Sequence, residues 1–500
     1  MTINIAALLG FGLMLMLSVM AGNRTARQTP SLLSYFWANR SLKAPTVVQL
    51  LLSTSFSLNG LLYHTWLGYA VGAYSILIQG IWCLGFIFLA LHAEKILALV
   101  SRDNLHGNIA RTFSRSAGGF AALATVLGFA SLAGWEFVVA GGLINEILSV
   151  PPSQAIWAAL LTAVVVAAYT IRGGLRGNAR ANSIQNLVAM AGLVSLAYFL
   201  FTRVPTAAIA GPNDLASAAR LFENPLLALG GVAFFANAYF SLVWQVADAT
   251  NWQAMSSTKG SAKALRKTLY WSSVLIIIAP GVIGTAIGMA LHGMPGITSD
   301  NIISRAVLAG DLPIWAIVLI AAGLCGAMLS TLDGLLLACA NAISWDWFKP
   351  KVSRIILAKQ LAGEPLSLDE SLTEGRILSL SYLSIFAIAV LSSLLVMLLD
   401  RNLPLFNIVY FAVIGQMAIV PCAIVTVLSS GRPSLRHGTA SICFGLVGGF
   451  GLFALSLALA KDHPEAAGLI GTAVPLATSG LALLPLLFKR RPSALPQNGQ

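Results

Sequence analysis

The segment Ala321-Ala-Gly-Leu-Cys-Gly-Ala-Met-Leu-Ser-Thr-Leu-Asp-Gly-Leu-Leu-Leu-Ala338 decides how the whole chain is interpreted. It is apolar enough to cross a bilayer, yet Ser330, Thr331 and Asp333 lie near its middle. Hydroxyl and carboxyl groups at that depth are costly unless they bind something or pair with one another. Hydroxyl oxygens are hard ligands of the kind that Na⁺ prefers. The segment therefore suggests a helical membrane protein that couples to a cation.

The composition extends this interpretation to the full length of the chain. Hydrophobic residues make up 57% of the sequence and charged residues only 10%, whereas a soluble protein carries about 25% charged residues. Apolar stretches long enough to cross the hydrocarbon core recur throughout. We therefore predict an all-α polytopic membrane protein with one integrated transporter domain over residues 1–491, and a disordered cytoplasmic tail over 492–500. Thirteen spans are expected at 3–21, 45–70, 72–98, 118–148, 153–171, 183–202, 225–247, 270–291, 313–341, 377–399, 404–428, 439–460 and 468–488.

The distribution of positive charge gives a topology for these spans. The net charge is +12, and the chain has 30 lysines and arginines. If the N-terminus lies outside, the loops on the outer side contain only Arg203, Arg220, Arg305, Arg401 and Lys461. This agrees with the positive-inside rule. We therefore predict a multi-pass protein of the cell (inner) membrane with its N-terminus outside and its C-terminus in the cytoplasm. The charge is explained by topology, so nucleic acid is not an expected partner.

Several classes of site are excluded by the motifs. The five cysteines all lie in apolar stretches without CxxC spacing, so they are expected to be buried thiols and not a disulfide framework or a metal site. No HExxH, GxSxG, P-loop or dinucleotide fingerprint occurs in a usable context. The first span has no basic region before it and no clear cleavage site after it, so we expect it to be retained. An enzyme or a protein with a bound cofactor is not expected.

The second predicted span contains an unusual run of small polar residues. Ser53, Thr54, Ser55, Ser57 and Asn59 crowd its middle, with Gly60 directly after them. Such residues compete for backbone hydrogen bonds and weaken a helix. Two interpretations stay open: a helix broken at a cavity, whose free carbonyls could coordinate a cation, or ordinary packing of small residues.

Other polar residues inside predicted spans are candidates for a substrate cavity. Glu136 lies beside Trp135 in span 4; it could bind a hydroxyl or an amine, carry a proton, or only make a structural hydrogen bond. His64 is either a cavity residue or a packed neutral histidine. Asn59 and Asn237 complete this set, together with Asp333 of the opening segment.

Span 7 offers a second possible interruption. It carries Gly230 and Gly231, followed by the polar residues Asn237, Ser241 and Gln245, and it opens the second group of five spans. Two interrupted helices that open two equal halves are typical of inverted-repeat transporters. Asp248 ends this span and is expected at the cytoplasmic surface.

Four segments resemble motifs of a known family. They are GGLRGNARANSIQ (173–185), ATNWQAMSSTKGSAKALR (249–266), LSTLDGLLLACANAISWDWFKP (329–350) and FWANRSL (36–42). They are similar, in that order, to the segments GGLRAVxWTDxxQ, VQRxxAAKSxKEAR, MSTxDSxLLxxSSxxxxDxYKP and FLAGRSL of the sodium:solute symporter family. They fall in register with the thirteen spans over about residues 1–490.

The resemblance implies a leucine-transporter-like core of five-plus-five inverted repeats. The first repeat would occupy 45–202 and the second 225–428, with an extra N-terminal span at 3–21 and two C-terminal spans within 439–488. It also implies a Na⁺ site between spans 2 and 9. Carried over by position, its ligands would be the carbonyls of Ser55, Leu58 and Ala327 and the hydroxyls of Ser330 and Thr331.

The chain departs from the family pattern at places that matter. Asn182 stands where the family has Asp, Arg180 where it has Trp, and Gly334 where it has Ser. Some members use that Asp for a further Na⁺, so the resemblance implies a single Na⁺ here. Ser57 replaces an Asp found in the proline-type members, which argues against a close relative of those carriers.

Two functions therefore remain in view. The first is symport of a small polar organic solute with Na⁺ into the cell by alternating access. The alternative is a transporter-like sensor or regulatory membrane subunit. The sensor alternative comes from family members that are fused to kinase domains, and the short stretch after Arg491 has no room for such a domain. The Ser330–Thr331 pair is also kept, although a pure sensor would not need it, so transport is favoured. The sequence does not name the solute or any protein partner.

Overall fold

The structure is a computed structural model, and it is a bundle of long helices. It describes residues 3–24, 31–148, 152–203, 231–292, 294–298, 301–309, 311–398, 405–432, 437–460 and 462–487. Within these residues, 10 helical segments are long and apolar enough to cross a membrane. One of them, Leu58–Leu91, contains two helices joined by a 3₁₀ turn. The prediction of an all-α polytopic membrane protein is confirmed, whereas the number of thirteen crossings stays a prediction.

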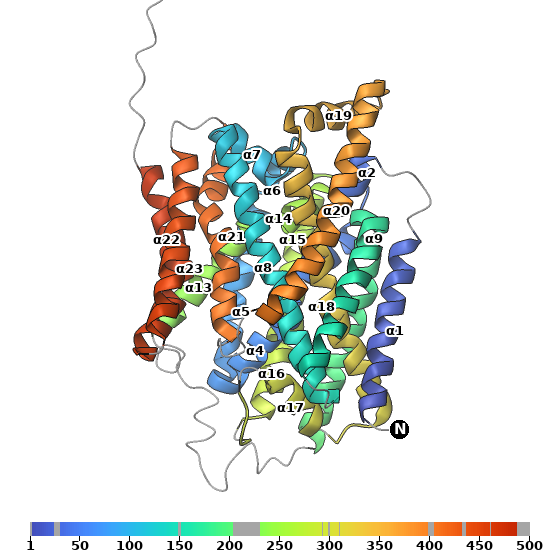
Figure 1. Ribbon diagram of the computed structural model, residues 1–500, viewed down its shortest axis with the longest axis vertical. Coiled ribbons are helices and arrows are strands. Elements are labelled where there is room, and N and C mark those ends of the chain that lie inside the picture. Colours follow the sequence, from blue (N-terminus) through green and yellow to red (C-terminus); the bar gives the residue numbers. More distant parts are fainter. Residues whose placement is uncertain are drawn as a thin grey trace, which may run out of the picture.

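The first part of the chain supplies the N-terminal helix and the helices that follow it. They are α1 (Ile3–Asn23), α2 (Leu32–Trp37), η1 (Ala38–Arg40), α3 (Ala44–Ser55), α4 (Leu58–Val71), η2 (Gly72–Tyr74), α5 (Ser75–Leu91), α6 (Ala93–Val100), α7 (Leu105–Thr112), α8 (Arg115–Leu148) and α9 (Pro152–Arg203). The helix α1 packs along α9 and α18 (Ile314–Asn341) at one side of the bundle (Figure 1).

The second part of the chain completes the bundle. Besides α18 it contains α13 (Gly231–Ala247), α14 (Ala249–Ser256), α15 (Ala262–Ile276), η3 (Ile277–Ile283), α16 (Gly284–Ala290), α17 (Ile302–Ala309), η4 (Ala342–Trp347), α19 (Pro350–Ala362), α20 (Leu368–Leu398), α21 (Leu405–Leu428), α22 (Gly438–Leu459) and α23 (Pro464–Leu487). The pair α22 and α23 lies at the side opposite α1, whereas α18 lies inside the bundle and is almost wholly buried (Figure 1). The polar segment of α18 is thereby enclosed by protein.

The second span is broken, as one of the two interpretations predicted. The helix α3 ends at Ser55, and Phe56 and Ser57 have non-helical backbone angles before α4 begins at Leu58. The hydroxyl of Ser57 accepts a hydrogen bond of 2.7 Å from the N–H of Gly60, which makes Ser57 the N-cap of α4. A serine at this position satisfies an N–H that the helix itself cannot. The local sequence therefore explains why the helix breaks here.

The boundary between spans 5 and 6 differs from the prediction. We expected a loop at 172–182, but α9 is helical on both sides of a single break at Gly174. Gly174 has φ +52, and a Cβ there would lie 2.7 Å from the carbonyl oxygen of Tyr35. Glycine can take this left-handed conformation and allows the close approach. One residue therefore turns the chain, and the predicted loop was too long.

The interruption predicted in span 7 is not found where the structure can test it. Gly231 begins α13, which continues without a break to Ala247, while Gly230 lies outside the described residues. Asp248 follows with non-helical angles and is 1% exposed, so its expected place at the surface was wrong. Its carboxylate caps α14 by accepting from the N–H groups of Thr250 and Asn251. A carboxylate at a helix N-terminus is favoured by the free N–H groups there.

The helix after α15 contains a π-helical turn at a proline. Pro280 lies within η3 and has no N–H to donate to the carbonyl of Ile276. The side-chain amide of Gln79, on α5, donates to that carbonyl at 3.2 Å instead. Gln79 is 1% exposed, so a buried polar side chain from another helix replaces the missing backbone bond.

Glycines allow several helices to pack at very short separation. A Cβ on Gly288 of α16 would lie 2.0 Å from the carbonyl oxygen of Thr65 on α4, and one on Gly68 would lie 2.5 Å from that of Thr285. Small residues at such crossings are typical of helix packing in membranes. They keep α4, which carries much of the candidate site, in a fixed position against α16.

A buried cluster of charged residues ties three segments together at the end of the bundle that carries α7 and α19 (Figure 1). Arg354 of α19 forms ion pairs with Asp103 and, at 3.2 Å, with Asp346 of η4. His106 of α7 contacts Asp346 at 2.8 Å and the hydroxyl of Thr125 at 2.9 Å. Burial raises the pKa of the Asp103 carboxyl, although the positive charge of Arg354 acts in the opposite direction.

Candidate functional site

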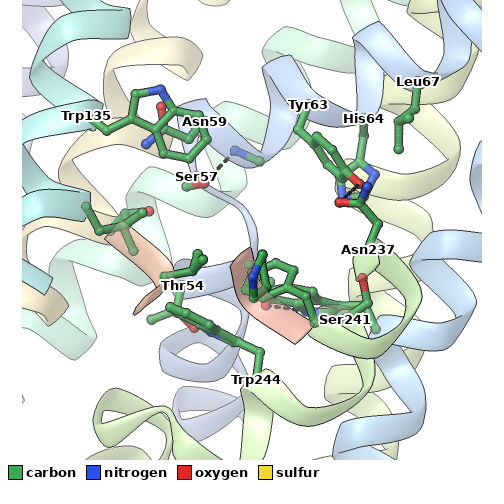
Figure 2. Close-up of a pocket in the computed structure, with 18 of the residues that line it drawn as sticks. Thr54, Ser57, Asn59, Tyr63, His64, Leu67, Trp135, Asn237, Ser241 and Trp244 are labelled. Carbon is green, nitrogen blue, oxygen red and sulfur yellow. Dashed lines mark hydrogen bonds between the residues drawn. The ribbon is translucent and has the colours of Figure 1, made fainter. Parts of the chain in front are cut away.

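A cavity of about 260 Å³ lies beside the break between α3 and α4. Its wall is built from α3, α4, α5, α8, α13, α18, α21 and α23, so both parts of the chain contribute. Figure 2 shows Asn59 and Trp135 on one side of this space, and Tyr63, His64 and Asn237 on the other. Because the broken segment faces the cavity, the unwound backbone has polar space next to it.

Aromatic side chains form much of the wall. They are Tyr63, Trp66, Trp82, Trp135, Phe240 and Trp244. The rings of Trp82 and Trp244 stack at 6.3 Å between centroids, and Phe240 meets the ring of Trp244 edge-on at 5.2 Å. These rings offer apolar faces with some negative potential to a solute in the cavity.

Hydrogen bonds fix two of these rings. The indole N–H of Trp82 donates to the hydroxyl of Ser55 at 3.1 Å, and that of Trp244 donates to the carboxylate of Asp248 at 3.0 Å. Asp248 also caps α14, so the helix terminus and the cavity wall share one buried carboxylate. The two indoles have thereby used their only N–H donors.

Several polar groups around the cavity have few partners. Glu136 is fully buried; one carboxylate oxygen accepts a long bond of 3.4 Å from the N–H of Asn59, and the other has no partner among the described residues. The side-chain amide of Asn59, the Nδ1 of His64 and the indole N–H of Trp135 are likewise buried without a partner in the described part of the chain. Buried polar groups are nearly always hydrogen-bonded in folded proteins. Four such groups around one cavity therefore indicate a place where a polar solute binds.

A hydrogen bond spans the other end of the cavity. The hydroxyl of Tyr63 on α4 donates to the side-chain carbonyl of Asn237 on α13 at 3.0 Å (Figure 2). This contact joins a helix from the first part of the chain to one from the second part. Asn237 is thus in the cavity, as the sequence predicted.

The hydroxyls of α18 reach the end of α3 near this cavity. The Thr331 hydroxyl lies 2.9 Å from the carbonyl oxygen of Ser53 and 3.2 Å from that of Ala327, and the Ser330 hydroxyl lies 3.0 Å from the same Ala327 oxygen. The carbonyl of Ser53 belongs to the last turn of α3, where helix carbonyls lack intrahelical partners. Four oxygens thereby gather where α18 crosses the break.

These oxygens suit a small hard cation by their chemistry, since all are neutral hydroxyl or carbonyl groups. Of the five predicted Na⁺ ligands, the structure brings together Ala327, Ser330 and Thr331. Ser55 lines the cavity and its hydroxyl accepts from Trp82, while Leu58 is buried at the first turn of α4. Ser53 contributes a carbonyl that the sequence-based set did not contain.

Asp333 is buried and is not among the residues that line this cavity, so its predicted role in substrate binding stays a prediction that this cavity does not support. Its carboxylate accepts from the hydroxyl of Tyr169 at 3.1 Å and, with the amide of Asn182 oriented to donate, from that residue at 3.0 Å. The oxygen of the same amide then accepts from the Ser53 hydroxyl at 3.2 Å. A polar network thus connects α9 and α18 to the last turn of α3, behind the cavity.

The cavity contains five of the six predicted substrate residues, namely Asn59, His64, Trp135, Glu136 and Asn237. Sequence reasoning missed Tyr63, Trp82, Phe240, Ser241 and Trp244. Tryptophan and phenylalanine are common in membrane helices, and the sequence does not say which face of a helix is turned inward. The sequence signals for this wall were the polar run of span 2, which ends at Gly60, and the isolated polar residues Glu136 and Asn237.

Comparison with solved structures places the fold. A Na⁺-coupled sialic acid symporter in a substrate-bound outward-open state matches with a TM-score of 0.65 at 16% identity, over 97% of this chain and 98% of that one. A nucleobase-cation-symport-1 family transporter in a closed conformation with bromovinylhydantoin bound matches with a TM-score of 0.50 at 13% identity, over 91% and 96%. No protein-family model and no curated protein sequence matches.

These likenesses concern the fold, because the sequence identities are low. At that level they show that the chain shares the fold of these two solved transporters. Within this fold, a cavity lined by aromatic and polar side chains lies beside the broken helix.

Proposed function

We propose that the chain is a symporter of the sodium:solute symporter type, which moves a small polar organic solute into the cell together with Na⁺. One observation carries this proposal: the Thr331 hydroxyl of α18 meets the last turn of α3 at the break that also faces the cavity. An ion bound there would hold the two segments together. Its binding and the shape of the cavity would then depend on one another.

Coupling requires that Na⁺ and the solute change the relative stability of two conformations of the protein. A ligand shifts an equilibrium only if it binds one conformation more tightly than the other. A Na⁺ ion coordinated by oxygens from two helices favours the conformation in which these oxygens lie close together. The solute, which contacts α4, α8 and α13 around the same break, favours the conformation that completes its cavity. Alternating access follows if both ligands stabilise the same outward-facing or occluded state.

The hydrogen bonding of Asn182 supports a stoichiometry of one Na⁺ per solute. Asn182 directs an N–H of its side chain, and not an oxygen, toward the carboxylate of Asp333. The amide nitrogen has no lone pair for a second cation, and the amide oxygen already accepts a hydrogen bond from the Ser53 hydroxyl at 3.2 Å. The ligands of the proposed single site are Ala327, Ser330 and Thr331, with carbonyls of the broken segment among Ser53, Ser55 and Leu58.

The proposal includes a topology. It places the chain in the cell (inner) membrane with thirteen crossings, the N-terminus outside and the C-terminus in the cytoplasm. The core would be two inverted repeats of five spans each, over 45–202 and 225–428. Accessibility of single introduced cysteines to a membrane-impermeant reagent tests it, with positions in α7 and α19 expected to react from the cytoplasmic side.

A transport experiment separates symport from the sensor alternative. The purified protein is reconstituted in proteoliposomes, and candidate sugars, amino acids, amines, carboxylates and nucleobases are screened for uptake with an inward Na⁺ gradient and with K⁺ in its place. Symport predicts Na⁺-dependent accumulation of at least one solute. A solute that binds to the purified protein but is never accumulated would favour the sensor.

A further inference from the structure

The described residues of the cavity wall include one acidic side chain, Glu136, and no lysine or arginine. Glu136 is 0% exposed, lines the cavity from α8, and its second carboxylate oxygen has no partner in the part of the chain that the structure describes. None of the ion pairs found between described residues includes it. A buried carboxylate without a positive partner is costly for the folded protein. A ligand that brings a positive charge removes that cost when it binds.

The neighbouring groups of the wall fit the same ligand. The side-chain oxygen of Asn59 has no partner in the described part of the chain, and the backbone N–H of this residue donates to the Glu136 carboxylate at 3.4 Å. Two acceptor groups, one on α4 and one on α8, therefore line the same cavity. An ammonium group has up to three N–H donors and can use both.

The opposite wall favours a cation as well. The stacked indoles of Trp82 and Trp244 line the cavity, and their N–H groups are committed to Ser55 and Asp248. Cations bind favourably over the faces of aromatic rings, tryptophan most of all. The same faces repel an anionic group.

The size of the cavity limits the ligand further. Its volume of about 260 Å³ is below the range of about 300–1,000 Å³ typical of pockets for drug-sized ligands. Six aromatic side chains line it, so the body of the solute is expected to be apolar or aromatic, with few polar groups.

We propose that the solute is a small organic cation, a monoamine with an apolar or aromatic body, whose ammonium group pairs with Glu136. This inference rests on the proposed transport function and names the class of its substrate. Acidic solutes are disfavoured because the described wall contains Glu136 and no lysine or arginine, and neutral solutes of the same shape are expected to bind more weakly.

The test uses three probes of one shape: benzylamine, benzyl alcohol and benzoate. Binding to the full-length purified protein is measured from the shift of its thermal unfolding transition at saturating Na⁺. In the wild-type protein, benzylamine is expected to bind at least tenfold more tightly than benzyl alcohol, and benzoate is expected not to bind. This comparison needs no variant, so it decides the inference even if a substitution prevents folding.

Two variants then test the role of the carboxylate. Glu136→Gln keeps the shape of the side chain and removes its charge, so the preference for benzylamine over benzyl alcohol should fall at least tenfold. Glu94→Gln makes the same chemical change on α6, where the side chain is 81% exposed and pairs with Arg266 at 3.6 Å. This control should keep the preference.

Several outcomes would overturn the inference. These are tighter binding of benzyl alcohol or benzoate than of benzylamine, no binding of benzylamine at all, or an unchanged preference in Glu136→Gln. Failure here is distinguishable from failure of the proposed function. A neutral or acidic solute that accumulates with Na⁺ in proteoliposomes would keep symport and reject the amine. An amine that binds through Glu136 but is never carried would do the reverse.

Discussion

Replacing Thr331 with valine removes one hydroxyl group and nearly conserves the shape of the side chain. Thr331 is 1% exposed, and its hydroxyl lies between the carbonyl oxygens of Ser53 on α3 and Ala327 on α18. The variant therefore deletes a contact between α18 and the broken segment without opening a large cavity. It also deletes one proposed ligand of Na⁺.

The two losses differ in size. A neutral hydrogen bond contributes about 1 kcal/mol to stability, whereas a hydrogen bond to a charged group contributes about 1.5–3 kcal/mol. If the contact between the Thr331 oxygen and Na⁺ resembles the latter, the Na⁺ concentration for half-saturation should rise about ten- to a hundredfold, since 1.4 kcal/mol corresponds to about a factor of ten. The stability of the protein without Na⁺ should fall by only about 1 kcal/mol.

The assay follows the thermal unfolding of the purified protein over a series of Na⁺ concentrations, with K⁺ added to hold the ionic strength constant. Ligand binding to the folded state raises the transition temperature in a concentration-dependent way. Thr426→Val is the matched control, because Thr426 is fully buried on α21 and its hydroxyl only contacts the carbonyl of Cys422 at 2.8 Å. The control should keep the wild-type response to Na⁺.

One result would refute the reasoning. If Thr331→Val responds to Na⁺ within threefold of the wild-type concentration, Thr331 is not a ligand. Its hydroxyl would then serve only to satisfy the carbonyl of Ser53 at the end of α3.

Three further predictions follow from the structure. Arg354→Ala removes the closer of the two ion pairs of the buried Asp103 carboxylate and leaves only the one with Arg111 at 3.7 Å, so it should destabilise the protein by about 3 kcal/mol. Restored stability in the double variant with Asp103→Asn would confirm the cause, and an unchanged unfolding temperature of the single variant would contradict it. Gly288→Ala places a Cβ 2.0 Å from the carbonyl oxygen of Thr65 and should lower the free energy of unfolding by about 1–3 kcal/mol. Gly12→Ala is the control, because a Cβ there meets nothing within 4 Å, and it should leave the unfolding temperature unchanged. Na⁺ activation of solute uptake should be hyperbolic, with a Hill coefficient near one, and a clearly sigmoidal curve would reject a single Na⁺ site.

Much of the candidate site follows from local sequence. The polar run from Ser53 to Gly60 contains both the residues that end α3 and the serine that caps α4, so the break could be predicted. The carboxyl of Glu136 could also be identified from the sequence, because it lies inside an apolar stretch. A carboxyl group is energetically costly in the membrane unless it binds a ligand or pairs with another group.

The remainder depends on contacts between distant segments. Asp333 has the same sequence signal as Glu136, yet it lies outside the cavity, where Tyr169 and Asn182 of α9 donate to one of its carboxylate oxygens. Its neighbours lie about 150 residues away in the chain, and only the packing of α9 against α18 reveals them. The loop predicted after span 5 was wrong for a similar reason. The left-handed conformation of Gly174 and its close approach to Tyr35 depend on a contact between distant segments.

The aromatic wall could not have been assigned from the sequence. Trp82 and Trp244 lie in unremarkable apolar stretches, and their orientation is set by hydrogen bonds to Ser55 and Asp248. Asp248 was predicted at the surface because it follows the last apolar residue of span 7. The short helix α14, buried against the bundle, covers it instead.

The most direct test of the central claim is the influx of radioactive Na⁺ into proteoliposomes that contain the purified protein. Influx is measured with and without a mixture of small amines, sugars, amino acids and carboxylates outside, for the wild-type protein and for Thr331→Val. The account predicts that the mixture accelerates Na⁺ influx through the wild-type protein, and that this acceleration is lost in Thr331→Val at Na⁺ concentrations that saturate the wild type. Equal Na⁺ influx with and without solutes, or the same acceleration in the variant, would contradict Na⁺-coupled transport through this site.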